Sequence, residues 1–216
     1  MFGVLVVVPS IEQYNSDPEA YLAANPLEIR DELLKSVGRN TEWKIEDLAG
    51  DLKSLKAGRS YEVGRSLFAA ASCVGCHKLG NEGKEFGPDL AKLEDKKMTA
   101  EYVLKSLLMP SADIEDKYRA RIFQMDSDAI ITGMVVEEND RAIKVMVDPL
   151  AKGEPTVLDK DEIVGQKVSA VSTMPQGLLN KLTKEEILDL MAYVLARGDK
   201  KHPAFHGHDH GGHGDH

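Results

Sequence analysis

The chain of 216 residues can form one large domain or two small ones and can bury a substantial core. Its hydrophobic fraction of 42% and charged fraction of 29% are typical of globular proteins. The net charge of −9 argues against a nucleic-acid-binding protein, because phosphates require a basic surface, and would suit a partner with a basic docking surface. Residues 1–8 are apolar but too few to span a bilayer, and they lack the basic residues that begin a signal peptide. We expect no membrane-spanning segment.

Residues 1–57 are predicted to be an N-terminal helical extension. Apolar residues between 27 and 37 have helical spacing. The only tryptophan, Trp43, precedes a second predicted helix that contains Leu48, Leu52 and Leu55. We expect the extension to pack against the rest of the protein, and we find no chemistry in it.

The segment 58–109 is predicted to be mostly helical. Its first helix carries residues at helical intervals: Tyr61, Gly64, Leu67, Phe68 and Ala71. A glycine inside a helix costs about 1 kcal/mol relative to alanine, so Gly64 indicates the close approach of a second helix. A glycine-rich loop follows, and Thr99 is a candidate N-cap for a helix over residues 100–108.

The only two cysteines of the chain, Cys73 and Cys76, are three positions apart and directly precede His77. This spacing is typical of a c-type haem attachment site, in which the two thiols add to the vinyl groups of one haem and the histidine is an axial ligand of the iron. A Cys₂His₂ zinc site would need a second histidine from the tail, a thioredoxin-like site would need a βαβ context, and a disulfide would leave His77 unexplained.

The surrounding sequence can serve such a site. The imidazole of His77 needs a carbonyl that accepts its Nδ1 proton, and the turn at Gly87, Pro88, Asp89 and Leu90 can supply one. A porphyrin also needs apolar walls, for which the sequence offers Phe68, Leu79, Leu90, Leu93 and Leu104.

The pattern changes to strands at residue 117. Alternating and β-branched runs separated by Asp-, Asn- and Ser-containing turns predict an antiparallel sheet of four or five strands over about 117–170. Residues 183–197 return to helix, with Thr183 and Glu186 as a capping box. Residues 199–216 are predicted to be a disordered tail with six histidines, which either binds transition metals loosely or is only a flexible polar segment.

Several motifs together resemble the class I c-type cytochromes: Gly64, Phe68, the Cys73–His77 segment, Gly87-Pro88, Met174-Pro175 and Tyr193 in a last helix. The resemblance implies that the carbonyl of Pro88 holds His77, that Met174 is the distal ligand, and that Gly64 meets Tyr193 where the first and last helices cross. It narrows to a subfamily of haem-binding domains with a β insertion between the attachment motif and a Met-Pro-x-Gly-Leu segment, and it covers about residues 58–197.

The expected fold is therefore mainly α, a class I cytochrome c helical core with a small antiparallel β-sheet insertion, which makes the whole chain α+β. The expected domains are an extension over 1–57, a cytochrome domain over 58–198 that is interrupted at about 117–170, and the tail over 199–216. The insertion either covers a haem edge, forms a docking surface, or has no direct role.

The sixth iron ligand has several candidates among eight methionines. Met125, Met134 and Met146 lie on predicted strands, and Met191 lies inside the last helix, so these four are assigned to packing. Met174 is favoured because it lies on a loop that enters the last helix. Met98, Met109, a tail histidine or no protein ligand are the alternatives.

The predicted function is that of a monohaem electron carrier, with Cys73 and Cys76 holding one covalent haem c and with His77 and Met174 as the ligands that favour outer-sphere electron transfer. Phe68, Pro88 and Leu90 complete the predicted cofactor-binding set, and no catalytic residues are predicted. A haem sensor, a catalytic haem domain, or the cytochrome subunit of a larger respiratory complex are the alternatives. Redox proteins are the expected partners. Because covalent attachment normally follows export, we expect a periplasmic or otherwise exported protein.

Overall fold

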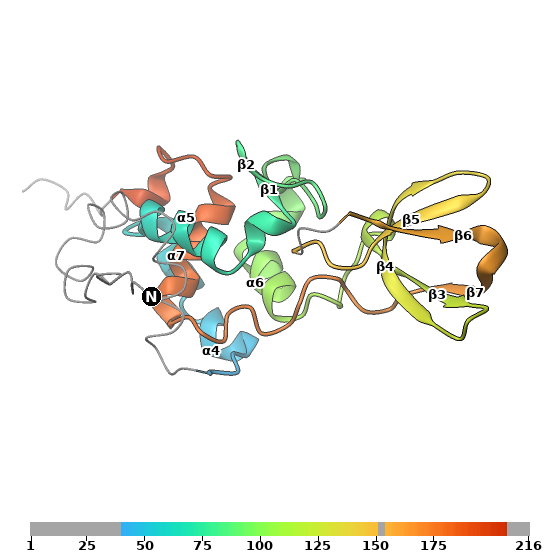
Figure 1. Ribbon diagram of the computed structural model, residues 1–216. Helices are drawn as coiled ribbons and strands as arrows, with labels where there is room; N and C mark the ends of the chain where they lie inside the picture. The colour runs from blue at the N-terminus through green and yellow to red at the C-terminus, as the bar shows by residue number, and fades with distance from the viewer. Residues whose placement is uncertain (1–39, 151–153, 207–216) are drawn as a thin grey trace, which may run out of the picture.

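The computed structural model describes residues 40–150 and 154–206, drawn in colour in Figure 1. Most of the predicted N-terminal extension, including its first helix, and most of the predicted tail lie outside the described residues. Within the described part no helix is both long and apolar enough to cross a membrane.

Within the described residues, the helical part contains four α-helices: α4 (Ile45–Ala49), α5 (Tyr61–Ala70), α6 (Ala100–Leu108) and α7 (Lys184–Leu195). The side chains of Ser60 and Thr99 accept backbone N–H groups in the first turns of α5 and α6, which satisfies donors that a helix leaves unpaired. Thr183 and Glu186 form a reciprocal capping box at the start of α7. The predictions of the Thr99 cap and of this box are confirmed.

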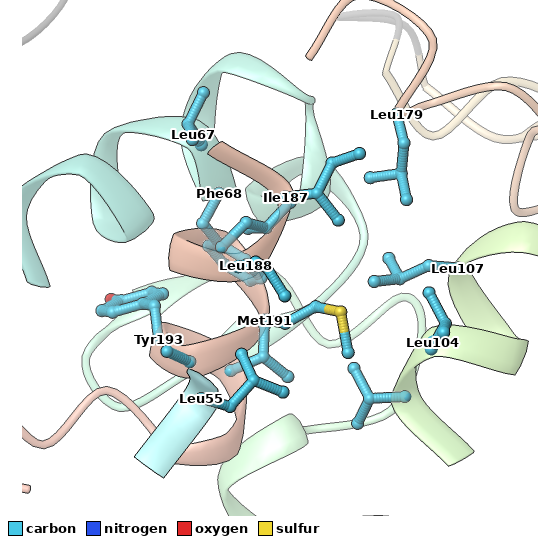
Figure 2. Close-up of a cluster of buried hydrophobic side chains, with 14 of the residues drawn as sticks. Leu55, Leu67, Phe68, Leu104, Leu107, Leu179, Ile187, Leu188, Met191 and Tyr193 are labelled. Carbon is cyan, nitrogen blue, oxygen red and sulfur yellow. The ribbon is translucent and has the colours of Figure 1, made fainter. Parts of the chain in front are cut away.

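The hydrophobic core of this part lies between α5, α6 and α7 (Figure 2). All three helices contribute to it, and the fully buried side chains include Leu67, Phe68, Leu104, Ile187, Leu190 and Met191. Burial of such a side chain is worth roughly 1.5–3 kcal/mol, so this core is the main stabilising feature of the helical part.

The described end of the extension packs on this core. Leu48 of α4 and Leu55 of the 3₁₀ helix η1 (Leu52–Lys56) are buried, and the Trp43 indole donates a hydrogen bond to the Leu182 carbonyl at 3.3 Å. The chain turns at Gly50 between α4 and η1, so the single helix predicted through Leu48 and Leu55 is wrong.

A five-stranded sheet forms the other part of the molecule and lies beside the helices in Figure 1. Its strands are antiparallel in the order β6-β5-β4-β3-β7. The bounds are β3 (Arg121–Met125), β4 (Ile130–Glu138), β5 (Ala142–Met146), β6 (Thr156–Asp159) and β7 (Ile163–Val168).

This sheet curls. Only the 3₁₀ turn η6 (Lys160–Glu162) joins β6 to β7, although these are the two outer strands. In a flat sheet they would lie about 19 Å apart at ~4.8 Å per strand, whereas four Cα steps span at most about 14 Å. The curled sheet buries its own inner face, where all five strands contribute to a second core of Phe123, Met125, Ile143, Val145 and Leu158, with Ile131, Val135 and Ile163 packed against it.

The expectation of a mainly α class I fold is wrong. The structure has 36% helix and 20% strand, with this five-stranded sheet and a small sheet of β1 (Lys78–Leu79) and β2 (Glu82–Gly83). The physical reason is that the strands after residue 120 bury a core of their own instead of decorating a helical one. The α-helices are also short, and 3₁₀ turns and loops fill the spaces between them. The fold is α+β.

Candidate functional site

The Cys73–His77 segment is a tight turn at the end of α5. The helix ends at Ala70 with Ala71 as its C-cap, Ser72 takes a left-handed conformation with φ 65°, and a 3₁₀ turn follows over η2 (Cys73–Gly75). The N–H groups of Cys76 and His77 both donate to the Cys73 carbonyl, at 3.1 and 2.8 Å. These bonds fold the segment back on itself, and the two thiols and the imidazole line one cavity.

The imidazole of His77 is held in place through its Nδ1 atom. That nitrogen lies 3.1 Å from the carbonyl oxygen of Pro88, at hydrogen-bond distance. The loop is fixed in turn because the N–H of Gly87 donates to the Cys76 carbonyl at 2.6 Å. With the Nδ1 proton directed to Pro88, the Nε2 atom is left as the acceptor and can bind a metal.

Burial lowers the pKa of His77 below its usual value, although the hydrogen bond to Pro88 works in the opposite direction. The ring is therefore neutral at neutral pH, which is the form that ligates metals.

The cavity has an empty volume of about 1390 Å³, a figure that includes the open solvent at its mouth. Its lining includes every predicted cofactor-binding residue: Phe68, Cys73, Cys76, His77, Pro88, Leu90 and Met174. Leu93 lines it as well. Leu79 and Leu104, which were also offered as walls, lie in the hydrophobic core instead.

Both cysteines are free thiols in this structure, and no disulfide joins them, in contrast to the disulfide alternative. Burial raises the pKa of Cys73 to about 12 and also raises the pKa of Cys76. Two neutral thiols and a neutral imidazole on the wall of a large apolar cavity fit the attachment of a haem through thioether bonds and an axial histidine.

Met174 lies on the loop before α7 and reaches the same cavity as His77. The loop is tied to the end of the α6 segment, because the N–H of Ser172 donates to the hydroxyl of Ser111 at 3.1 Å across 61 residues of sequence. The N–H of Met174 donates to the Ser172 hydroxyl, also at 3.1 Å. The two ends of the β insertion therefore meet at the cavity.

Among the other methionines, Met98 and Met134 also line the cavity, whereas Met109 is 48% exposed and lies outside the lining. The assignment of Met134 to sheet packing is incomplete, because its neighbour Val135 packs on the sheet core while Met134 reaches the cavity from the opposite face. Successive side chains of a strand point to opposite faces, so the sequence of β4 could have shown that Met134 and Val135 lie on different sides of the sheet.

Sequence reasoning missed a polar end of the cavity. Lys97 forms an ion pair with Glu115, and the hydroxyl of Tyr102 donates to Asp113 at 3.0 Å. The hydrogen bond to Lys97 lowers the pKa of Glu115, and burial is the main cause of the raised pKa of Tyr102. A large ligand in this cavity would thus meet apolar walls over most of its surface and charged or hydroxyl groups at one end.

Over the described ranges 40–150 and 154–206 no three His, Cys, Asp or Glu side chains are grouped as they would be to hold a metal ion. The histidines from His208 onward lie outside those ranges.

A search of curated proteins finds no match to this chain. Residues 61–134, from the start of α5 to Met134, match the family model described as Cytochrome c. The matched stretch contains Cys73, Cys76 and His77 and ends before Met174. This match, over a segment that forms most of the cavity wall, supports a c-type cytochrome that binds haem and transfers electrons.

Proposed function

We propose that this protein is a monohaem c-type cytochrome that carries single electrons between redox partners. One observation carries the proposal: two thiols, a neutral imidazole and a thioether, drawn from positions 73, 76, 77 and 174, line a single apolar cavity. No other cofactor that proteins commonly bind uses this set of groups at this spacing.

Each residue has a defined task in this proposal. Cys73 and Cys76 hold one haem c covalently, and His77 and Met174 are its axial ligands. The carbonyl of Pro88 keeps the His77 ring oriented and its Nε2 atom available, as the 3.1 Å contact supports. Phe68 and Leu90 form part of the apolar wall, which keeps water away from the cofactor.

When bound, the haem supplies a one-electron Fe(III)/Fe(II) couple. The protein contributes what tunes that couple. A thioether sulfur and a neutral imidazole favour the ferrous state more than two imidazoles do, and an apolar wall disfavours the added charge of the ferric state. Two protein ligands also leave no open position for a substrate, which favours electron transfer over catalysis at the iron.

The first test is the attachment itself. In the purified holoprotein, the mass should exceed that of the chain by one haem, and the pyridine haemochrome spectrum should be that of a haem with two thioether bonds. A redox titration should follow a one-electron curve. Loss of haem from the wild type on denaturation would refute the covalent attachment. More than one haem per chain would refute the proposal of a single haem.

The second test is the sixth ligand. In Met174→Ala, the long-wavelength band that a Met-ligated ferric haem shows should disappear and the midpoint potential should fall. Met109→Ala is the matched control, because Met109 lies outside the cavity lining. A band that survives in Met174→Ala but is lost in Met98→Ala would assign the ligand to Met98 instead.

A haem sensor or catalytic haem domain is the second candidate, and the polar end of the cavity with Lys97, Tyr102 and Asp113 favours it. It requires a sixth ligand that exogenous molecules displace. Binding of carbon monoxide by the reduced wild-type protein at micromolar concentration would support this candidate against the electron carrier.

We further propose that the protein acts outside the cytoplasm, since haem c is normally attached after export. The net charge of −9 favours a redox partner with a basic docking surface. The native mass of the purified complex would distinguish a single carrier from the cytochrome subunit of a respiratory assembly.

A further inference from the structure

Three residues of the β insertion belong to the wall of the cavity, namely Tyr118 at its start and two residues from farther along it. Met134 comes from β4, and Leu150 comes from the connection between β5 and β6. Figure 1 shows the part of this connection that follows β5, residues 147–150, running from the sheet back toward the helical part. The insertion therefore shares a site with the residues proposed to hold the haem.

Met134 contacts the loop that carries the proposed distal ligand. Its side chain is 7% exposed, and its Sδ atom lies 3.8 Å from the hydroxyl oxygen of Thr173, which donates to it. Thr173 directly precedes Met174. Together with the bond from Ser172 to Ser111, this contact holds the loop at two neighbouring residues.

Leu150 contacts the other side of the site. Its Cδ2 atom would lie 2.3 Å from a β-carbon at Gly75, so the leucine methyl group rests directly on the backbone between Cys73 and Cys76. The N–H of Leu150 donates to the carboxylate of Asp148 at 2.9 Å, which fixes the approach of the leucine to that backbone. The β insertion thus contacts both the attachment segment, through Leu150, and the distal-ligand loop, through Met134.

We propose that the β insertion is a positioning element of the haem site: Met134, through Thr173, holds Met174 in its ligating position, and Leu150 covers the Cys73–Cys76 segment. The inference rests on the proposed function. It adds that Met134, Thr173 and Leu150 determine the strength of the bond between Met174 and the iron and the solvent exposure of the cofactor. Contacts behind a ligand commonly decide its orientation, and a loop held at fewer points samples more conformations.

The test of Met134 is competition for the iron by imidazole in the ferric holoprotein. Thr173→Val removes the donor and keeps the shape, and Met134→Leu removes the sulfur acceptor at similar volume. Each should raise the apparent imidazole affinity about fivefold, the effect of losing one weak hydrogen bond that favours the Met-ligated state. Met146→Leu is the control. Met146 lies on β5 opposite Met134 of β4 but outside the cavity lining, so this substitution should leave the imidazole affinity unchanged.

The test of Leu150 is the midpoint potential. In Leu150→Ala, more water reaches the attachment segment, and the potential should shift downward because water stabilises the ferric state. Val157→Ala on β6 also removes an exposed apolar side chain from the insertion, but Val157 lies outside the cavity lining and its substitution should produce no shift.

The outcomes separate the two proposals. If Met174→Ala abolishes the Met-ligated spectrum while Thr173→Val and Met134→Leu bind imidazole as the wild type does, the positioning role is overturned and the proposed function stands. Equal effects from Met134→Leu and Met146→Leu also overturn it, because any loss of sheet packing would then suffice. If Met174→Ala leaves the spectrum unchanged, both the distal ligand and this inference fail.

Discussion

Gly64 of α5 lies against the backbone of α7 at Asp189 and Tyr193. A β-carbon at Gly64 would stand 2.3 Å from the Asp189 carbonyl oxygen and 2.7 Å from the Tyr193 β-carbon, both far inside contact distance. The predicted crossing of the two helices at Gly64 and Tyr193 is confirmed, and Gly64 is there because no larger residue fits between the helices.

Gly64→Ala should therefore destabilise the protein, although alanine favours helix. The helix preference of alanine is worth about 1 kcal/mol, but separating two helix backbones in a packed core costs about 1–3 kcal/mol or more. We expect a lower thermal midpoint and no change in haem content. Gly50→Ala is the control, because a β-carbon there meets nothing within 4 Å, and an equal loss of stability in that variant would contradict this explanation.

Asp189 at the same crossing should make stability depend on pH. Its carboxylate oxygen Oδ1 accepts the Ser60 N–H at 3.0 Å and lies 3.6 Å from Nε of Arg59, and both contacts favour the ionised form. Burial nevertheless dominates and raises the pKa of Asp189 from 3.8 to about 6. Because the folded state binds the proton more tightly than the unfolded state, the ionised carboxylate weakens the fold above about pH 6. That cost is relieved as the pH falls from about 6 toward 3.8.

The variant Asp189→Asn isolates this effect, since the amide keeps an acceptor for Ser60 and carries no charge. Between pH 7 and pH 5 the free energy of unfolding of the wild type should rise relative to that of the variant by about 1 kcal/mol, which is part of the roughly 3 kcal/mol that the whole shift is worth below pH 3.8. Urea unfolding at several pH values measures the difference. Parallel curves for the two proteins would show that Asp189 does not titrate in this range.

The local parts of the site could be predicted from the sequence because each depends on a few neighbouring residues. The spacing of Cys73, Cys76 and His77 is set by one turn of chain, and the carbonyl of Pro88 lies only 11 residues from His77. The helix caps at Thr99 and Thr183 are likewise local.

Most of the predictions that failed concern features that depend on packing between residues far apart in the sequence. Whether the strands pack against the helical core or form a separate hydrophobic core depends on how the sheet curls. The alternation of residues along β4 or β7 does not predict that curvature. Leu150 could not be assigned to the cavity because its contact with Gly75 joins residues far apart in the sequence. The break in the predicted helix at Gly50 was local, but leucine spacing alone does not distinguish an α-helix from an α-helix followed by a 3₁₀ turn.

Gly87→Ala should disturb the proximal ligand without releasing the haem. A β-carbon at Gly87 would stand 2.9 Å from Cε1 and 3.1 Å from Nδ1 of His77, so the ring must move and its bond to the Pro88 carbonyl must lengthen. We expect unchanged haem content, because the cysteines are untouched, but a shifted midpoint potential and altered electron paramagnetic resonance of the ferric protein. Gly165→Ala, where the nearest atom is 3.7 Å away, is the control. Identical spectra for wild type and Gly87→Ala would contradict the close approach at His77.

Phe123→Ala should separate the stability of the sheet from that of the helices. Phe123 is fully buried in the core of the sheet, which shares no buried residue with the core of the helical part. Its truncation should cost about 3–5 kcal/mol, and hydrogen exchange should show faster exchange at the amides of β3, β4 and β7 while α5 and α7 keep their protection. Gln124→Ala, the exposed neighbour on the other face of β3, should have little effect. If α5 and α7 lose protection together with the strands, the two cores unfold as one unit, and the cavity between them would then be assembled in the same cooperative step.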